Sequence, residues 1–251
     1  MLLQVEDLSV SFGGLQALNL SSFSLARNEL RVIIGPNGAG KSTFMDLLCG
    51  RTKADRGKVI FDGTSTLGKT EVEIAELGIG RKFQKPSVFP SLSVYDNMLL
   101  AVKMEKGVFA SLFFSMTSDI DDRIRDTAVR VGLHAVLDKA AGDLSHGQKQ
   151  WLEIAIVVLQ HPKLLLIDEP AAGMSDRETE KTGELLIELS KQHSVIVIEH
   201  DMHFVKQIAR DKVTVFVNGQ LLTEGTFSQV KNDQRVIDSY LGRSSAKTVN
   251  S

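Results

Sequence analysis

The chain has 251 residues, 43% of them hydrophobic and 24% charged, which excludes disorder as its main state and suits one large domain or one domain with a lobe. Its 29 basic and 31 acidic residues leave a net charge of −2, which disfavours a strongly basic nucleic-acid binder. The single cysteine, Cys49, excludes an intramolecular disulfide and fits a reducing compartment.

The apolar runs are short. Residues 107–116, the longest suggestive stretch, fall well below the roughly 18 residues of a membrane span. The first ten residues lack a basic region and carry Glu6 and Asp7, so we expect no signal peptide. We therefore expect a soluble, intracellular protein. If it works at a membrane, another chain must carry the membrane spans.

The first 65 residues predict several strands around one helix. Gly13-Gly14 reads as a turn, and a helical pattern follows from Lys41 to Cys49. The predicted strands are Leu3–Val5, Leu8–Phe12, Leu18–Leu25, Leu30–Ile34 and Lys58–Phe61.

The middle of the chain, from about residue 86 to 142, is more polar and helical. Ser93–Met104 and Asp121–Val131 are the helix candidates, with a capped start in residues 118–122. The apolar stretch 107–116 is either core of this lobe or a contact surface for another chain, and core is the favoured interpretation.

The last hundred residues return to an α/β pattern. Leu164–Ile167, Val195–Ile198 and Lys212–Val217 are short, continuously apolar runs, typical of buried parallel strands. Asn218-Gly219 after the third run predicts a hairpin. Residues 243–251 are polar, and we expect a frayed tail.

A phosphate-binding loop follows the strand at residues 30–34. Glycines let the backbone turn its N–H groups toward phosphates, while Lys41 supplies a cation and Ser42 a Mg²⁺ ligand. The alternative is a chance match in a glycine-rich turn. Such a match does not account for nine matching positions between a strand and a helix. The loop reads Gly35, Pro36, Asn37, Gly38, Ala39, Gly40, Lys41, Ser42 and Thr43.

Two acids close the apolar run Leu164–Ile167. A carboxylate at the carboxyl end of a buried strand lies beside such a loop, so Asp168 is assigned to the Mg²⁺ shell. Successive strand residues face opposite ways, so Glu169 is assigned a different role, general base for water.

Leu144-Ser145-His146-Gly147-Gln148 lies 20 residues before Asp168, and here the chain resembles ABC-type ATPases, whose signature is LSGGQ. The resemblance runs from about Leu3 to Gly242. It implies an α/β P-loop NTPase fold with a RecA-like core, an N-terminal antiparallel β subdomain and a helical lobe inserted at about residues 86–160.

The resemblance also implies site roles. Phe12 fits the aromatic that stacks on adenine, Gln84 the glutamine that joins nucleotide and Mg²⁺ to the lobe, and His200 the switch histidine beside the γ-phosphate. A plain strand residue, an exposed polar residue and a structural histidine are the respective alternatives. Residues 173–176 fit the loop that touches a partner subunit.

The signature implies a second subunit. In the family, Ser145, Gly147 and Gln148 would contact ATP bound to the other subunit, so two subunits pair head to tail around two ATPs. His146 replaces the first glycine of the signature. It is either a solvent-exposed substitute, which we favour, or a contact that tunes the partner interface.

The chain looks most like ATPase subunits of importers for branched-chain amino acids and related small polar solutes. Residues 80–86 and 144–153 most resemble the urea and short-chain amide branch. The expected partners are two membrane-spanning permease subunits, a similar or identical ATPase subunit and, indirectly, a periplasmic or extracellular solute-binding protein. The expected place is the cytoplasmic face of the plasma membrane.

Two other classes compete with an importer ATPase. A non-transport ABC ATPase acting on ribosomes or DNA usually carries two cassettes or long coiled coils, and this chain has neither. A GTPase or small-molecule kinase does not explain the signature.

Overall fold

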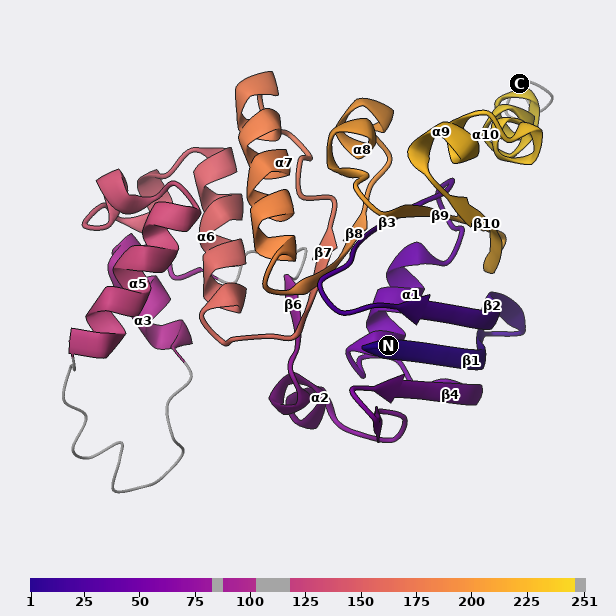
Figure 1. Ribbon diagram of the computed structural model, residues 1–251, viewed down its shortest axis with the longest axis horizontal. Helices are drawn as coiled ribbons and strands as arrows, with labels where there is room; N and C mark the ends of the chain where they lie inside the picture. Colours follow the sequence, from indigo (N-terminus) through magenta and orange to yellow (C-terminus); the bar gives the residue numbers. More distant parts are fainter. Residues whose placement is uncertain (83–87, 103–117, 247–251) are drawn as a thin grey trace.

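The computed structural model describes residues 1–82, 88–102 and 118–246, with 241–246 described by their backbone alone. Two sheets and a set of helices make up the fold (Figure 1). The smaller sheet has the order β2-β1-β4-β5, and the larger has the order β10-β9-β3-β8-β7-β6.

The smaller sheet is antiparallel and holds the N-terminus (Figure 1). Its strands are β1 (Leu3–Phe12), β2 (Leu15–Leu25), β4 (Arg56–Phe61) and β5 (Thr64–Ser65).

The structure joins the two strands expected at residues 3–5 and 8–12 into the single strand β1. Asp7 adopts a φ of 47°, and the pairing with β4 shifts between Glu6 and Ser9. This irregularity moves the buried positions from Leu3 and Val5 to residues 8 and 10, which keeps both halves facing the core. The break in alternation is what made one strand look like two.

The larger sheet is parallel except at the β10 edge. Its strands are β3 (Leu30–Ile34), β6 (Ile79–Lys82), β7 (Leu164–Asp168), β8 (Ser194–Ile198), β9 (Lys212–Val217) and β10 (Gln220–Gly225). The predicted strands of the last hundred residues and the hairpin at Asn218-Gly219 are confirmed.

The central strands are mostly apolar because they bury both faces. In β7, Leu165 and Ile167 join the core against the helical side, while Leu164 and Leu166 join the core shared with the smaller sheet. Helices α6, α7 and α8 stand on one side of the sheet, and α1 lies toward the smaller sheet (Figure 1).

The helices and short 3₁₀ turns complete the fold. They are α1 (Lys41–Leu48), α2 (Glu71–Leu77), α3 (Val94–Ala101), α5 (Ser118–Arg130), η1 (His134–Val136), η2 (Ala141–Asp143), α6 (His146–Val158), α7 (Asp176–Ser190), α8 (Met202–Ile208), α9 (Phe227–Lys231) and α10 (Gln234–Ala246).

The helices expected at residues 41–49, 93–104 and 121–131 are present as α1, α3 and α5. Helix α3 ends at Ala101, three residues before the expected end, and α5 begins three residues before the expected Asp121. Helix α10 continues through residues 243–246, which we expected in the frayed tail. The stretch 107–116 lies outside the described residues, as do Met104 and residues 247–251. None of the helices in the described ranges is long and apolar enough to cross a membrane.

Candidate functional site

The phosphate-binding loop connects β3 to α1. Gly35 and Gly40 have φ values of 153° and 93°, and a Cβ at Gly35 would overlap the carbonyl oxygen of Phe216 in β9. Only glycine fits this close approach between loop and sheet. The Nζ of Lys41 donates hydrogen bonds to the carbonyl oxygens of Gly35 (2.7 Å) and Pro36 (3.1 Å), so the lysine lies over the loop.

The start of α1 lacks the side-chain cap that other helices have. Its N-cap residue is Gly40, and no side chain caps the helix. Ser93, Ser145 and Ser175, by contrast, cap α3, α6 and α7 with their hydroxyl groups. A helix start without a side-chain cap is the kind of helix end that binds a phosphate.

The structure brings Ser42 and Asp168 together, as the sequence predicts. The Ser42 hydroxyl lies 3.4 Å from Oδ2 of Asp168, whose residue is 4% exposed. Burial raises the pKa of the Asp168 carboxyl, and the positive charge of Arg81 opposes that rise. Two such oxygens fit a Mg²⁺ ion, which keeps several water or phosphate ligands; in the parts of the chain described, no three His, Cys, Asp or Glu side chains gather as a metal cluster.

Glu169 points away from its neighbour. Its backbone adopts a φ of 46°, and its side chain is 43% exposed, in contrast to the buried Asp168. Oε1 of Glu169 lies 3.4 Å from Nδ1 of His200, which follows β8 and is 59% exposed. The predicted general base and the predicted switch histidine are thus neighbours at the carboxyl end of the sheet.

Glu199 organises this edge and was missed by the sequence analysis. It is 2% exposed, and its carboxylate accepts hydrogen bonds from the backbone N–H groups of Ala171 (3.3 Å) and His200 (3.1 Å). Burial raises its pKa, opposed by these backbone hydrogen bonds. Glu199 therefore ties the loop after β7 to the loop after β8, and an acid directly before His200 was the available signal.

Arg81 of β6 is a second group that the sequence analysis did not single out. Its NH1 nitrogen lies 2.5 Å from Oδ1 of Asp46 and 3.3 Å from Sγ of Cys49, both near the end of α1. The cysteine is buried, and its sulfur contacts this guanidinium. Arg81 thus links the edge strand to the helix of the phosphate-binding loop.

The signature residues form a separate cluster at the start of α6. Ser145 caps the helix in a capping box with Gln148, and its hydroxyl donates to Oε1 of Glu178 in α7 (3.0 Å). Nε2 of His146 lies 3.0 Å from the carbonyl oxygen of Ala172. His146 is exposed, as expected, and also contacts the segment that leads from β7 to residues 173–176.

The remaining predicted site residues are Phe12 and Gln84. Phe12 is the last residue of β1, next to the Gly13-Gly14 turn, and is 52% exposed, which leaves its ring open to a planar partner. Gln84 lies outside the described residues, and its role stays a prediction.

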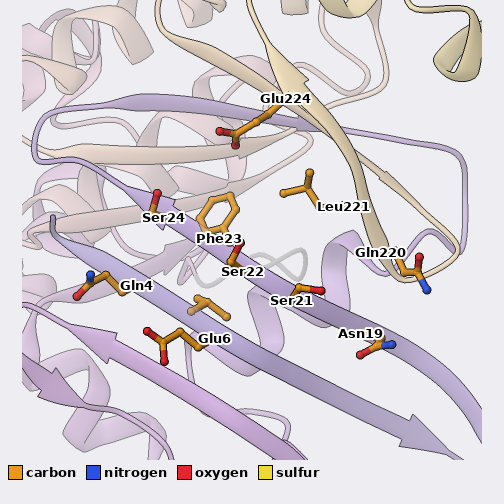
Figure 2. Close-up of a pocket in the computed structure, with 11 residues that line it drawn as sticks. Gln4, Glu6, Asn19, Ser21, Ser22, Phe23, Ser24, Gln220, Leu221 and Glu224 are labelled. Atoms are coloured by element: carbon orange, nitrogen blue, oxygen red, sulfur yellow. The ribbon is translucent and has the colours of Figure 1, made fainter.

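A hollow of about 580 Å³ between β1, β2 and β10 lies apart from these residues (Figure 2). Glu6, Phe23 and Glu224 are among its lining side chains, and no lysine or arginine lines it. The two carboxylates disfavour a phosphate ligand, so the hollow adds nothing to the site.

A smaller cavity of about 190 Å³ lies beside β6. It is lined by Lys82 of β6, by Glu153, Ile156 and Val157 of α6, and by Glu71 and Ala75 of α2. Nζ of Lys82 lies 3.3 Å from Oε2 of Glu153, and both side chains are buried. Lys82 is also the last described residue before Gln84 in the sequence.

Known proteins resemble this chain over nearly its whole length. The family described as ABC transporter matches residues 18–172. LivG of Escherichia coli strain K12, a high-affinity branched-chain amino acid transport ATP-binding protein, is 36% identical over 250 residues, covering 96% of this chain and 98% of LivG. BraF of Pseudomonas aeruginosa, of the same description, is 33% identical with the same coverage.

Solved structures agree with the sequence relatives. An ATP-binding cassette of an ABC transporter in its ADP conformation superposes with a TM-score of 0.85 at 30% identity, over 96% of this chain and 98% of that one. A nucleotide-free cassette superposes with a TM-score of 0.83 at 29% identity, over 95% and 98%.

Proposed function

We propose a function from one premise: the chain belongs to the ABC transporter family, as an ATP-binding subunit. It is an ABC transporter ATPase with the P-loop fold of that family. From this premise, we propose that it powers uptake of a small polar solute through membrane-spanning partner chains. The adjacency of Ser42 to Asp168 and of Glu169 to His200 supports the ATP hydrolysis that such uptake requires, because the proposed Mg²⁺ ligands and the proposed base would then lie at one edge of the sheet.

The proposed chemistry assigns each side chain one task. Lys41 and the N–H groups at the start of α1 bind the β- and γ-phosphates of ATP, and Phe12 stacks on the adenine. Ser42 and Asp168 supply oxygen ligands for Mg²⁺, which when bound neutralises charge on the phosphoryl oxygens.

Glu169 takes the proton of the attacking water. Its exposed carboxylate faces the side of the sheet edge where His200 stands, and a neutral imidazole there orients water or phosphate. Asp168, at the same edge, is turned toward α1 and leaves this task to Glu169.

We further propose a head-to-tail pair of subunits. The P-loop residues contact β7 and β9, whereas the signature residues contact α7, so one chain carries two separate half-sites. In a head-to-tail pair, Ser145 and Gly147 of one subunit complete the ATP site of the other. The pair is formed with an identical or similar subunit.

The membrane partners are proposed to dock beside β6. The cavity there is lined by Ile156 and Val157 of α6 and by the buried pair Lys82 and Glu153, and Lys82 precedes Gln84 by two residues in the sequence. Closure of the pair would pass to the membrane chains through this region, which puts the subunit at the cytoplasmic face of the plasma membrane.

The solute is proposed from relatives and from sequence resemblance. LivG and BraF are named for branched-chain amino acid transport, which favours that solute class. Residues 80–86 and 144–153 resemble the urea and short-chain amide branch, which makes these solutes the second candidate.

The experiment reconstitutes the full complex with its permease chains and solute-binding protein in lipid vesicles. ATP hydrolysis is measured with leucine, urea or acetamide as solute. Stimulation by one of these supports the importer and identifies the solute class. Stimulation by ribosomes or DNA, with no membrane-spanning partner in the purified complex, contradicts it.

A separate variant tests the assignment of Glu169 as the general base. Glu169→Gln should retain MgATP while lowering turnover by about 100-fold or more, the usual contribution of a general base. Glu184→Gln makes the same chemical change at an exposed position of α7 and should leave turnover unchanged. Unchanged hydrolysis in the Glu169→Gln complex would count against the assignment.

A further inference from the structure

One carboxylate joins the N-termini of two helices. Oε2 of Glu178, in the first turn of α7, accepts hydrogen bonds from the hydroxyl (2.8 Å) and the backbone N–H (3.1 Å) of Ser175. Its Oε1 accepts from the hydroxyl of Ser145 (3.0 Å), the cap of α6. Glu178 therefore completes its own capping box and also holds the signature serine.

The Ser145 hydroxyl has no second hydrogen to give. Its oxygen accepts a bond from the backbone N–H of Gln148 (3.2 Å), and its only hydrogen points to Glu178. A Ser145 hydroxyl in this arrangement cannot donate to a phosphate oxygen. Contact with γ-phosphate requires the hydrogen to turn away from Glu178.

The same carboxylate lies against the signature glycine. A Cβ on Gly147 would come within 2.5 Å of Oε1 of Glu178. Hydrogen bonds from Ser175 keep the pKa of Glu178 below its ordinary value, and the bond from the Ser175 backbone has the largest effect. The carboxyl group is therefore ionised at neutral pH. A negative charge thus lies against both residues that are proposed to receive the γ-phosphate of the partner's ATP.

We propose that Glu178 is a positioning residue that holds the Ser145 hydroxyl in the separated subunit and opposes ATP-driven closure of the pair. The inference rests on the proposed head-to-tail pairing. On closure the Ser145 hydrogen turns from Glu178 to a phosphate oxygen, while the bonds from Ser175 remain. The carboxylate raises the ATP concentration needed for closure and favours separation once the γ-phosphate has left.

Charge and shape can be separated at this position. Glu178→Gln keeps the length of the side chain and an oxygen acceptor but removes the charge. It should lower the MgATP concentration for half-maximal occlusion by roughly fivefold, the size expected for loss of one repulsive charge near a half-exposed site. Glu178→Asp keeps the charge and should not tighten occlusion. Glu184→Gln, six residues further along α7, is the matched control and should leave it unchanged.

The assay measures nucleotide occlusion by the assembled complex carrying Glu169→Gln, titrated with MgATP. If this parent complex occludes no ATP, the proposed pairing fails before Glu178 is involved. If the parent occludes ATP and Glu178→Gln leaves the half-saturating concentration unchanged or raises it, the inference about Glu178 is overturned.

Thermal unfolding of the purified subunit separates positioning from plain capping. A residue that only caps α7 would lower the melting temperature and weaken occlusion together when changed to Gln. The proposal instead expects tighter occlusion whatever the melting temperature does. Tighter occlusion with Glu184→Gln as well would also refute it, because the effect would then be one of net charge.

Discussion

The buried pair of Lys82 and Glu153 offers a quantitative test of how the edge strand is held to the signature helix. The side chains are 4% and 7% exposed, and their charged atoms lie 3.3 Å apart. At an effective dielectric constant near 20 the attraction is about 5 kcal/mol, most of it offset by the cost of removing both charges from water. Changing one partner therefore costs far more stability than changing both.

Lys82→Met leaves Glu153 buried without its cation. Burial already raises the pKa of Glu153 from its ordinary value of 4.5, and Lys82 opposes that rise. The unpaired carboxyl takes up a proton instead of remaining charged, which at pH 7 limits the loss of unfolding free energy to about 3.4 kcal/mol. Because the folded chain then binds the proton more tightly than the unfolded chain, this loss shrinks as pH falls, by roughly 1.4 kcal/mol per unit.

Glu153→Met leaves the ammonium of Lys82 buried without its anion and should lower the unfolding free energy by about 3–5 kcal/mol. The double variant, with two unbranched apolar side chains of similar length, should lie within about 2 kcal/mol of the wild type.

Urea unfolding followed by the fluorescence of Trp151, the single tryptophan, measures all four proteins of this cycle, because Trp151 lies two residues from Glu153 on α6. A double variant whose loss equals the sum of the two single losses would refute the reasoning, since the pair would then have no coupling. A loss in Lys82→Met that does not shrink as pH falls would refute the assignment of a buried carboxylate to Glu153.

Three further outcomes follow from the structure. Gly35→Ala should lower both stability and ATP affinity, because the added Cβ overlaps a backbone oxygen of β9. At Gly38 an added Cβ meets no atom, so Gly38→Ala tests only the strain of a positive φ. ATP titration and thermal melting compare the two variants. A hydrogen bond from Lys163 and the nearby charge of Arg27 lower the pKa of Asp62. Asp62→Asn should therefore destabilise the chain at neutral pH, and the difference from wild type should vanish as pH falls below 3.8. Acid titration followed by circular dichroism measures this difference. Trp151→Phe removes the buried bond to Thr182 (2.9 Å) and should cost about 1–3 kcal/mol in urea unfolding, with Thr182→Val costing less in the Phe background than in wild type.

Local patterns were enough for much of this fold. The largely apolar runs of β3, β7, β8 and β9 predicted their bounds to within a residue, because a strand buried on both faces is mostly apolar, although Arg31 and Thr214 are buried within two of them. Glycines and a lysine at fixed spacing predicted the loop at residues 35–43. The neighbours Ser42 and Asp168 followed from the rule that parallel strands end at one edge.

Other elements escaped the sequence analysis. Strand β6 has the sequence Ile-Gly-Arg-Lys, with no apolar run, and it is a strand because β7 offers it a parallel edge and Gly80 lets Val157 of α6 approach. Helix α7 was also missed, although Ser175 and Glu178 have the spacing of a capping box. The expectation of two strands before residue 13 was wrong because a shift in register hid their continuity.

By itself, the sequence excluded an intramolecular disulfide and disorder as the main state, and it disfavoured a strongly basic nucleic-acid binder. Its short motifs predicted the phosphate site. Only the tertiary structure decided that Glu178 holds Ser145, 33 residues earlier, and that Lys82 meets Glu153. The reason is physical. Propensity, capping and periodicity act over a few residues, whereas the partner of a buried or shared charge depends on which surfaces meet when the sheet and helices pack together.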